Sequence, residues 1–180
     1  MNDKKVYRFF DYDQCFAFYT KRIMNIRQAK IRGEVIVAKP VLLLTIIDGI
    51  DAGVILANEV MLTEWLESRY VMLMQKHMLN SQFEKPTDIS NPFWHLQSDG
   101  FWHLQFMEKP QKGTTPSKHW LKENISFAYL DDDLWLLLQE KEWRPKLRDY
   151  IVEHKLTDDS WFRKMAAEGL GTIAALIFAA

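Results

Sequence analysis

The sequence predicts an α+β protein, mainly helical, with a winged helix-turn-helix-like core, a β-hairpin wing and additional C-terminal helices. Two observations predict this class. Apolar residues recur at helical spacing along most of the chain. In addition, the sequence FWHLQ occurs twice, at 93–97 and 101–105, on either side of Ser98-Asp99-Gly100, and a turn sequence between two aromatic runs is typical of a hairpin.

The first part of the chain predicts two helices. Asp13 is a suitable N-cap for a helix over Gln14–Ile31, which Gly33 would end. Pro40 suits the first turn of a second helix, Val41–Asp51, which is apolar on nearly all sides and is therefore expected at the centre of the core.

The middle of the chain predicts a short strand near Val54–Leu56, a helix over Thr63–Leu79 and a polar loop over Ser81–Ser90. The hairpin then follows over Phe93–Phe106. Its order after two helices, a short strand and a third helix is that of a winged helix-turn-helix, and a Pro- and Gly-containing loop is expected at Glu108–Ser117.

The last part of the chain, from Lys118 onward, is predicted to be helical. We expect helices at Lys118–Glu123, Asp132–Glu140 and Arg144–Lys155, and a final one from about Asp159. The acidic run Asp131–Asp133 is interpreted as a helix N-terminus that complements the helix dipole.

In the predicted hairpin, His95 pairs with His103 and Gln97 with Phe101 across a three-residue loop. Because strand side chains alternate, one face is apolar and packs, whereas the other carries histidine and glutamine side chains that can contact a ligand.

With 180 residues and 48% hydrophobic content, the chain is expected to form a single domain over 1–180, with 157–180 a possible C-terminal appendage or docking helix. Cys15 is the only cysteine, and the N-terminus does not resemble a signal peptide, so a cytoplasmic protein is expected. The longest apolar run, Gly169–Ala180, is too short to span a bilayer, so no membrane association is expected.

Charge is distributed unevenly, although the net charge is only −1. Residues 1–40 contain nine Lys or Arg and four acidic residues, a local charge of +5, so the remaining residues sum to −6. Such asymmetry indicates a basic face for phosphates, with a solvated helix surface as the alternative.

The usual catalytic signatures are missing from the sequence. It contains no Gly-rich phosphate loop, no G-x-S-x-G, no H-E-x-x-H and no C-x-x-C motif. His95 and His103 could supply two ligands for zinc, but further ligands are not evident. We therefore expect no enzyme activity, no metal and no cofactor.

Lys39-Pro40 opening an apolar helix, together with Asn91-Pro92-Phe93-Trp94-His95-Leu96 and Asp99-Gly100-Phe101-Trp102-His103-Leu104, resembles the sulfur-binding domain of phosphorothioation-dependent restriction proteins, which is found fused to HNH nuclease modules in bacteria. The resemblance covers about Gln14 to Lys155. It implies binding to duplex DNA in which sulfur replaces one non-bridging phosphate oxygen, with the sulfur in a small surface cavity.

The resemblance also implies which residues form the cavity. They are Lys39 with Pro40, and Asn91, Pro92 and His95. Lys39 stands where the family can have Arg, and Asn91 stands where an aromatic residue can precede the proline, so we expect a more polar and less selective cavity.

Physical chemistry supports such a site. Sulfur is more polarizable and less well hydrated than oxygen, so a proline ring favours sulfur over a desolvated oxygen, while a cation holds the negative charge. The sequence offers further basic residues for the DNA backbone: Lys21, Arg22, Arg27, Lys30 and Arg32. It also offers candidates for base contacts: Gln97, Ser98 and His103.

The sequence contains no matching nuclease, because 158–180 lacks histidine and cysteine. A stand-alone reader, the N-terminal part of a larger protein, or a separately encoded nuclease partner would each explain this, and a homodimer is a further possibility. Two other classes stay open, namely a winged-helix regulator of unmodified DNA and a protein-interaction module.

Overall fold

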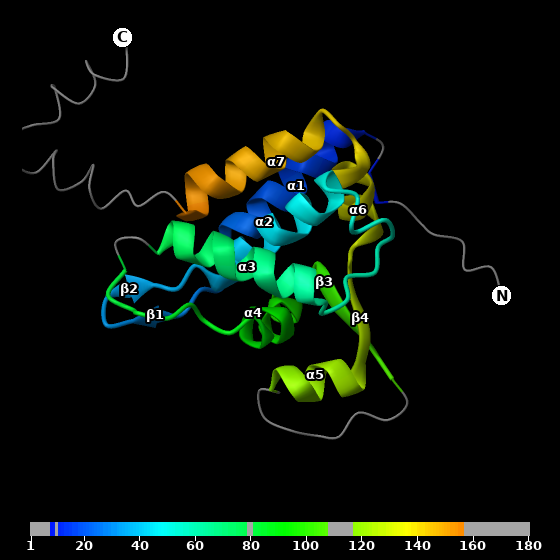
Figure 1. Ribbon diagram of the computed structural model, residues 1–180. Coiled ribbons are helices and arrows are strands. Elements are labelled where there is room, and N and C mark those ends of the chain that lie inside the picture. Colours follow the sequence, from blue (N-terminus) through cyan, green and yellow to red (C-terminus); the bar gives the residue numbers. More distant parts are fainter. Residues whose placement is uncertain (1–7, 10, 79–80, 108–116, 157–180) are drawn as a thin grey trace, which may run out of the picture.

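The computed structural model describes residues 8–9, 11–78, 81–107 and 117–156. The protein is α+β and mainly helical, as predicted, with two small antiparallel sheets in this part of the chain (Figure 1).

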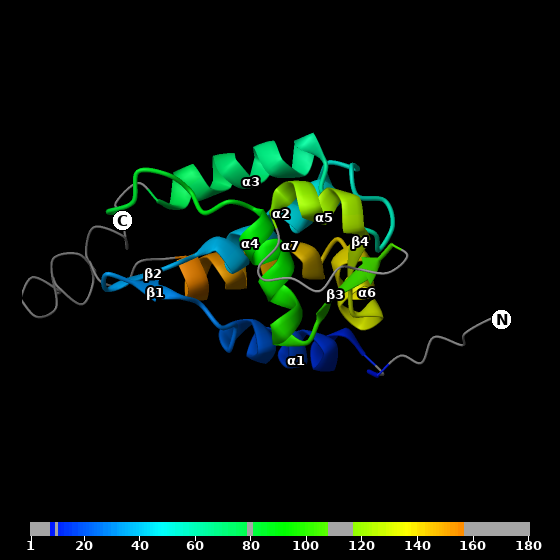
Figure 2. The ribbon, with the colours of Figure 1, turned by 90° about the horizontal axis from the view of Figure 1, so that it is seen from below.

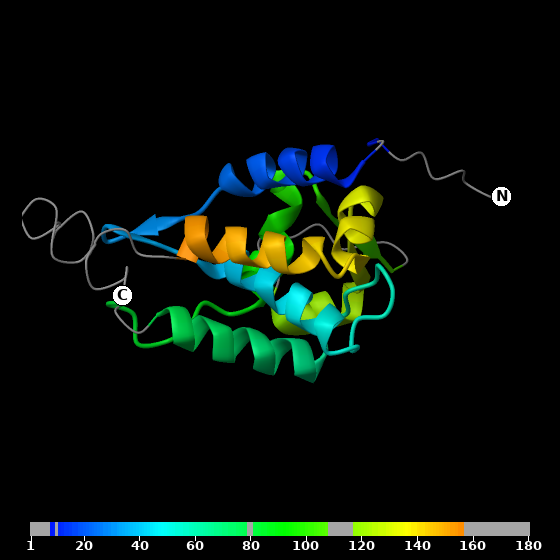
Figure 3. The same ribbon diagram turned by 90° about the horizontal axis from the view of Figure 1, so that it is seen from above.

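Helix α2 (Ala38–Asp51) forms the centre of the core, as its apolar sequence predicts. Residues 40–50 are all buried. Helices α1 (Tyr12–Met24) and α3 (Glu64–His77) lie on opposite sides of it. Seen from below, α4 (Ser90–His95) crosses under α2 from the α3 side to the α1 side (Figure 2). Seen from above, α7 (Trp143–Ile151) lies between α1 and α3 (Figure 3).

Side-chain caps fix where several helices begin. The α3 cap is Thr63, whose hydroxyl accepts from the Leu66 N–H at 3.3 Å, so this start is as predicted. The cap of α1 is Asp11 rather than the predicted Asp13, and it accepts from the Gln14 N–H at 2.8 Å. Such bonds satisfy N–H groups that have no partner within the helix.

Helix α1 is shorter than predicted, because it ends at Met24 rather than near Ile31. A small hairpin follows, formed by β1 (Lys30–Ile31) and β2 (Glu34–Val35). Its two turn residues have positive φ, 51° at Arg32 and 87° at Gly33. The glycine that we interpreted as a helix end therefore serves a tight hairpin turn.

The predicted hairpin over Phe93–Phe106 is wrong. Its first half is α4 followed by a 3₁₀ helix, η1 (Leu96–Asp99), and only its second half is a strand, β3 (Trp102–Phe106). Strand β3 pairs instead with β4 (Ile125–Leu130), which we did not predict, and His103 lies opposite Tyr129. The predicted wing at this position does not form.

Although they form no hairpin, the two FWHLQ segments contact each other. The Trp102 indole N–H donates to the Phe93 carbonyl at 2.8 Å, and the two rings lie perpendicular with centroids 5.3 Å apart. Both side chains are buried, so the aromatic pair links α4 to β3 inside the core.

The C-terminal helices lie where the sequence predicts them. They are α5 (Lys118–Asn124), α6 (Asp132–Gln139) and α7, which continues as a π-helical turn, η2 (Val152–Leu156). The strand predicted near Val54–Leu56 does not form, although Val60 makes an isolated bridge with Ala128.

The loop predicted at Glu108–Ser117 lies outside the described residues except for its last residue, as do the final predicted helix and 157–180. Among the described helices, none is both long enough and apolar enough to cross a bilayer.

Candidate functional site

The first turn of α2 carries the two predicted residues Lys39 and Pro40. Pro40 is buried, and the Lys39 side chain is 11% exposed. No side chain caps this helix at Val37, and its first turn contains no acidic residue. The positive end of the helix dipole thus lies beside a lysine, an arrangement that favours an anion.

The short helix α4 carries the other three residues implied for the cavity. Asn91 is exposed, Pro92 is buried in the first turn, and His95 is half-buried at the last residue. A proline in a first turn disrupts no intrahelical hydrogen bond. The Asp88 carboxylate accepts from the Ser90 N–H at 2.9 Å and so holds the start of α4.

Asp99, the last residue of η1, contacts Lys39 in α2 and Arg27 just after α1. We call this contact region the Asp99 junction. The Asp99 Oδ2 accepts from the Lys39 ammonium at 2.6 Å, and its Oδ1 accepts from the Arg27 backbone N–H at 3.1 Å. The Lys39 ammonium also lies 3.5 Å from the Ser98 hydroxyl. The structure therefore brings Lys39 to the segment that directly follows α4.

Arg22 reaches the same junction from α1. Its guanidinium donates to the backbone carbonyls of Asp99 and Gly100 at 3.4 and 3.3 Å, and it lies 4.8 Å from the centre of the Phe18 ring. Gly100 has φ of 79°, and a β-carbon there would lie 2.7 Å from the Arg22 guanidinium. The positive φ explains why glycine occupies the turn, because other residues rarely adopt this conformation.

The other predicted backbone-binding residues are spread over two elements. Lys21, near the end of α1, and Arg27, just after it, are exposed. Lys30 and Arg32 are also exposed and lie on the β1–β2 hairpin, although Lys30 was predicted within the helix Gln14–Ile31.

Two of the predicted base-contacting residues lie at the junction. Gln97 and Ser98 are exposed on η1, where their side chains donate to the carbonyls of Trp94 and His95, each at 2.8 Å. Both side chains are exposed, and the Ser98 hydroxyl lies beside Lys39.

His103 lies elsewhere and does not pair with His95. Its Nε2 is 2.7 Å from the Asp131 carboxylate, and its ring lies 5.0 Å from the Tyr129 ring. Asp131 also accepts from the Tyr19 hydroxyl at 2.9 Å, and its carboxylate lies 3.7 Å from the Arg8 guanidinium. Burial raises the pKa of Tyr19, and the hydrogen bond to Asp131 raises it further.

Two carboxylates at these junctions were not anticipated from the sequence. Asp99 was interpreted only as a turn residue, and no local pattern signals its contacts with residues 60 and 72 positions away. Asp131 does lie at the start of α6 as predicted, but its side chain makes no cap bond there and is used by Tyr19 and His103 instead.

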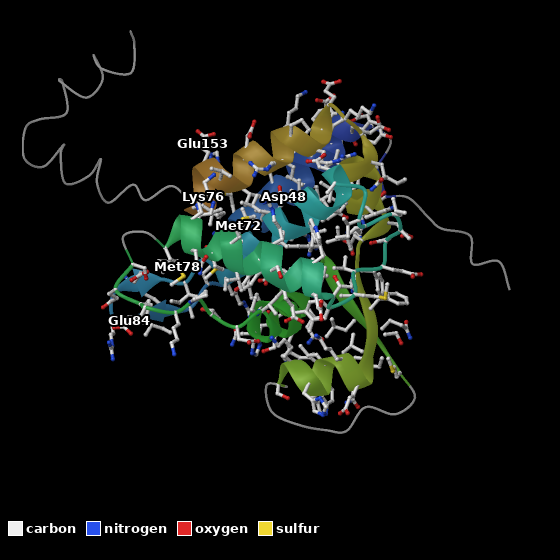
Figure 4. All side chains as sticks on the ribbon, in the orientation of Figure 1. Asp48, Met72, Lys76, Met78, Glu84 and Glu153 are labelled. Atoms are coloured by element: carbon white, nitrogen blue, oxygen red, sulfur yellow. The ribbon has the colours of Figure 1, made fainter. Side chains whose placement is uncertain are left out.

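A shallow cavity of about 460 Å³ lies away from the Asp99 junction, between the end of α2 and α3. The buried Asp48 carboxylate lies at its edge and binds Arg69 at 2.6 Å and Arg148 at 3.3 Å. In Figure 4, Asp48 and Met72 lie where α2, α3 and α7 meet. These ion pairs connect three helices.

Comparison with known proteins identifies the kind of domain. Residues 18–169 match a family model described as ScoMcrA-like, DNA sulfur-binding domain. The match covers most of the chain, including the Asp99 junction and all of the predicted site residues. No curated protein matches the chain.

Proposed function

Since the chain belongs to the ScoMcrA-like family of DNA sulfur-binding domains, we propose that it binds double-stranded DNA carrying a phosphorothioate, as the reader of a modification-dependent restriction system. The modified phosphate lies at the start of α2, between Lys39 and the α4 segment Asn91–His95. The observation that carries this proposal is the link between Lys39 and Ser98-Asp99, which holds the start of α2 against η1, the segment that directly follows α4.

The start of α2 provides the attraction for the phosphate. Its uncapped first turn and the Lys39 ammonium both favour a negative group. A phosphorothioate diester and an ordinary diester each carry one negative charge, so this attraction is common to both. It positions the backbone without distinguishing sulfur from oxygen.

Discrimination between sulfur and oxygen requires an apolar contact. Pro92 offers a ring in the first turn of α4, next to the exposed Asn91. A desolvated oxygen loses its hydration there, whereas sulfur loses less. One contact of this size is worth about 1–3 kcal/mol, which corresponds to a preference of roughly tenfold to a hundredfold.

Other basic residues supply most of the affinity. Lys21 and Arg27 on the surface near the end of α1, and Lys30 and Arg32 on the β1–β2 hairpin, are suited to neighbouring phosphates. Gln97 and Ser98 are suited to base edges, because they are exposed beside Lys39. We assign DNA cleavage to a separate domain or subunit, because 158–180 contains no histidine or cysteine for the chemistry of an HNH module.

The test is the affinity of the full chain for one short duplex, with and without a single stereo-defined phosphorothioate, at two salt concentrations. We expect at least tenfold tighter binding of the sulfur-bearing duplex. Equal binding of the two duplexes would refute the proposal.

Two variants locate the sulfur contact. Pro92→Gly should abolish the preference for sulfur and leave weak binding to both duplexes. Pro92→Ala is the matched control for helix stability, because it also removes the ring but keeps good helix propensity. A full preference retained by both variants would exclude Pro92 as the contact.

A further inference from the structure

The carboxylate of Asp99 is almost completely buried against Lys39. The Asp99 side chain is 4% exposed and the Lys39 side chain 11%, and their charged atoms lie 2.6 Å apart. The other carboxylate oxygen is held by the Arg27 N–H. Asp99 is thus fixed from two sides as a negative charge next to the lysine of the proposed phosphate site.

The charge of Asp99 also reaches a second lysine. The Lys155 ammonium donates to the Met24 carbonyl at the end of α1 at 3.0 Å. Burial lowers the pKa of Lys155, and attraction by Asp99 partly offsets that effect. Asp99 therefore attracts Lys155 as well as Lys39.

A lysine already paired with a buried carboxylate attracts a phosphate less strongly than a free one. The Asp99 carboxylate also repels the phosphate directly. Water screens these charges only weakly, because the Asp99 and Lys39 side chains are both largely buried. Resting on the function proposed above, we infer that Asp99 is a built-in counter-ion that limits the attraction of Lys39 for DNA phosphates and so keeps binding to unmodified DNA weak.

This role has a specific consequence for selectivity. Ordinary and sulfur-bearing diesters carry the same net charge, so Asp99 weakens both by a similar factor and leaves their affinity ratio unchanged. Weaker binding overall leaves a larger fraction of the protein free of DNA, while the partition between modified and unmodified sites still depends on the affinity ratio. The apolar contact with sulfur then decides which sites remain occupied.

The test replaces Asp99 by Asn, which keeps an oxygen acceptor for the Arg27 N–H and removes the charge. At low salt we expect both duplexes to bind about threefold to tenfold more tightly, with a salt dependence steeper by about one phosphate contact. The ratio between the two duplexes should stay within about twofold of the wild-type ratio, as a shared charge effect requires.

Glu142→Gln is the matched control. It removes the same charge from an exposed side chain at the start of α7, so we expect little change in DNA affinity. Weaker binding by Asp99→Asn, or an equal gain from Glu142→Gln, would overturn the inference. Asp99→Ser provides a second uncharged side chain should the Asn variant fold poorly, and far-UV circular dichroism checks each protein.

A double-mutant cycle identifies Lys39 as the residue through which Asp99 acts. In a Lys39→Met background, Asp99→Asn should tighten binding clearly less than in the wild type, because only the direct repulsion of the phosphate by Asp99 is then relieved. A gain as large as in the wild type would mean that Asp99 acts as a general surface charge, which contradicts the inference. The two proposals are refuted by different results. The proposed function is refuted if the wild-type protein shows no preference for the sulfur-bearing duplex, whereas this inference is refuted by the affinities of the Asp99 variants.

Discussion

Two fully buried tyrosines differ in whether the hydroxyl group has a hydrogen-bond partner. Tyr19 and Tyr70 both have 0% exposure. The Tyr19 hydroxyl donates to Asp131, whereas the Tyr70 hydroxyl has no hydrogen-bond partner among the described residues. Burial raises the pKa of Tyr70, as expected for a phenol in an apolar site.

We therefore expect removal of the hydroxyl group to change the free energy of unfolding differently at the two positions. Tyr70→Phe should leave the free energy of unfolding within about 0.5 kcal/mol of wild type or raise it, because it removes an unsatisfied polar group. Tyr19→Phe should lower it by about 2 kcal/mol, because it breaks a bond to a carboxylate. Urea unfolding of both variants checks the pair. Equal losses would contradict the assignment of the hydroxyl partners.

At the scale of elements, Glu67 joins α3 to α5. Its carboxylate lies 2.8 Å from the Lys118 ammonium and 2.6 Å from that of Lys122. Burial alone would raise the pKa of Glu67, but its hydrogen bonds with the two lysines outweigh burial and lower it. A lowered carboxyl pKa stabilises the fold above the ordinary value of 4.5, and the stabilisation is lost as pH falls through the folded-state pKa.

The lowered pKa of Glu67 predicts how the stability of the Glu67→Gln variant depends on pH. The variant should lose less stability than wild type between pH 6 and pH 3, because its side chain binds no proton in this range. Urea midpoints at several pH values measure the difference. Glu123→Gln is the control, since Glu123 is exposed and pairs only with His119 in the described structure. The same acid loss in wild type and Glu67→Gln would refute this linkage.

The two FWHLQ segments show what local sequence can and cannot predict. One lies mainly in α4 and η1, and the other lies in β3. The helical copy follows Asp88 and Pro92, which favour a helix start, whereas the strand copy pairs with β4 across more than 20 positions. Helices with their own caps or apolar stripes, such as α2 and α3, were predictable, because their signals are local.

The site was predictable only in part for the same reason. Lys39 and Ser98 do come together, but the Asp99 carboxylate, which also binds Arg27 just after α1, does not follow from any spacing. His103 shares a sequence repeat with His95 yet contacts Asp131, because strand pairing decides its neighbours. Contacts between distant segments were therefore the main information missing from the sequence.

For the whole molecule, most of the exposed Lys and Arg side chains among the described residues up to 40 lie near the end of α1 and on the β1–β2 hairpin. Other exposed lysines lie on different helices, including Lys76 on α3 (Figure 4) and Lys146 on α7. If DNA binds at the Asp99 junction, only the first group should contribute to affinity.

A pair of double variants tests this division. Lys21→Ala with Arg27→Ala should weaken both duplexes by about tenfold at low salt and lower the salt dependence by about two phosphate contacts. Lys76→Ala with Lys146→Ala removes the same charge elsewhere and should change affinity little. Titrations at several salt concentrations compare them. Similar losses in the two variants would mean that net charge, rather than position, governs binding.

The burial of α2 on all sides has a consequence for the thermodynamics of the binding proposed at its first turn. A helix held by α3, α4 and α7 along its length does not need to become ordered when a phosphate arrives. Little apolar surface is then newly covered beyond the contact itself, so calorimetry should give a small heat-capacity change, unlike the large negative value of coupled folding and binding. On the proposed function, we expect the domain to bind as a preformed receptor, with its site already built when the core folds.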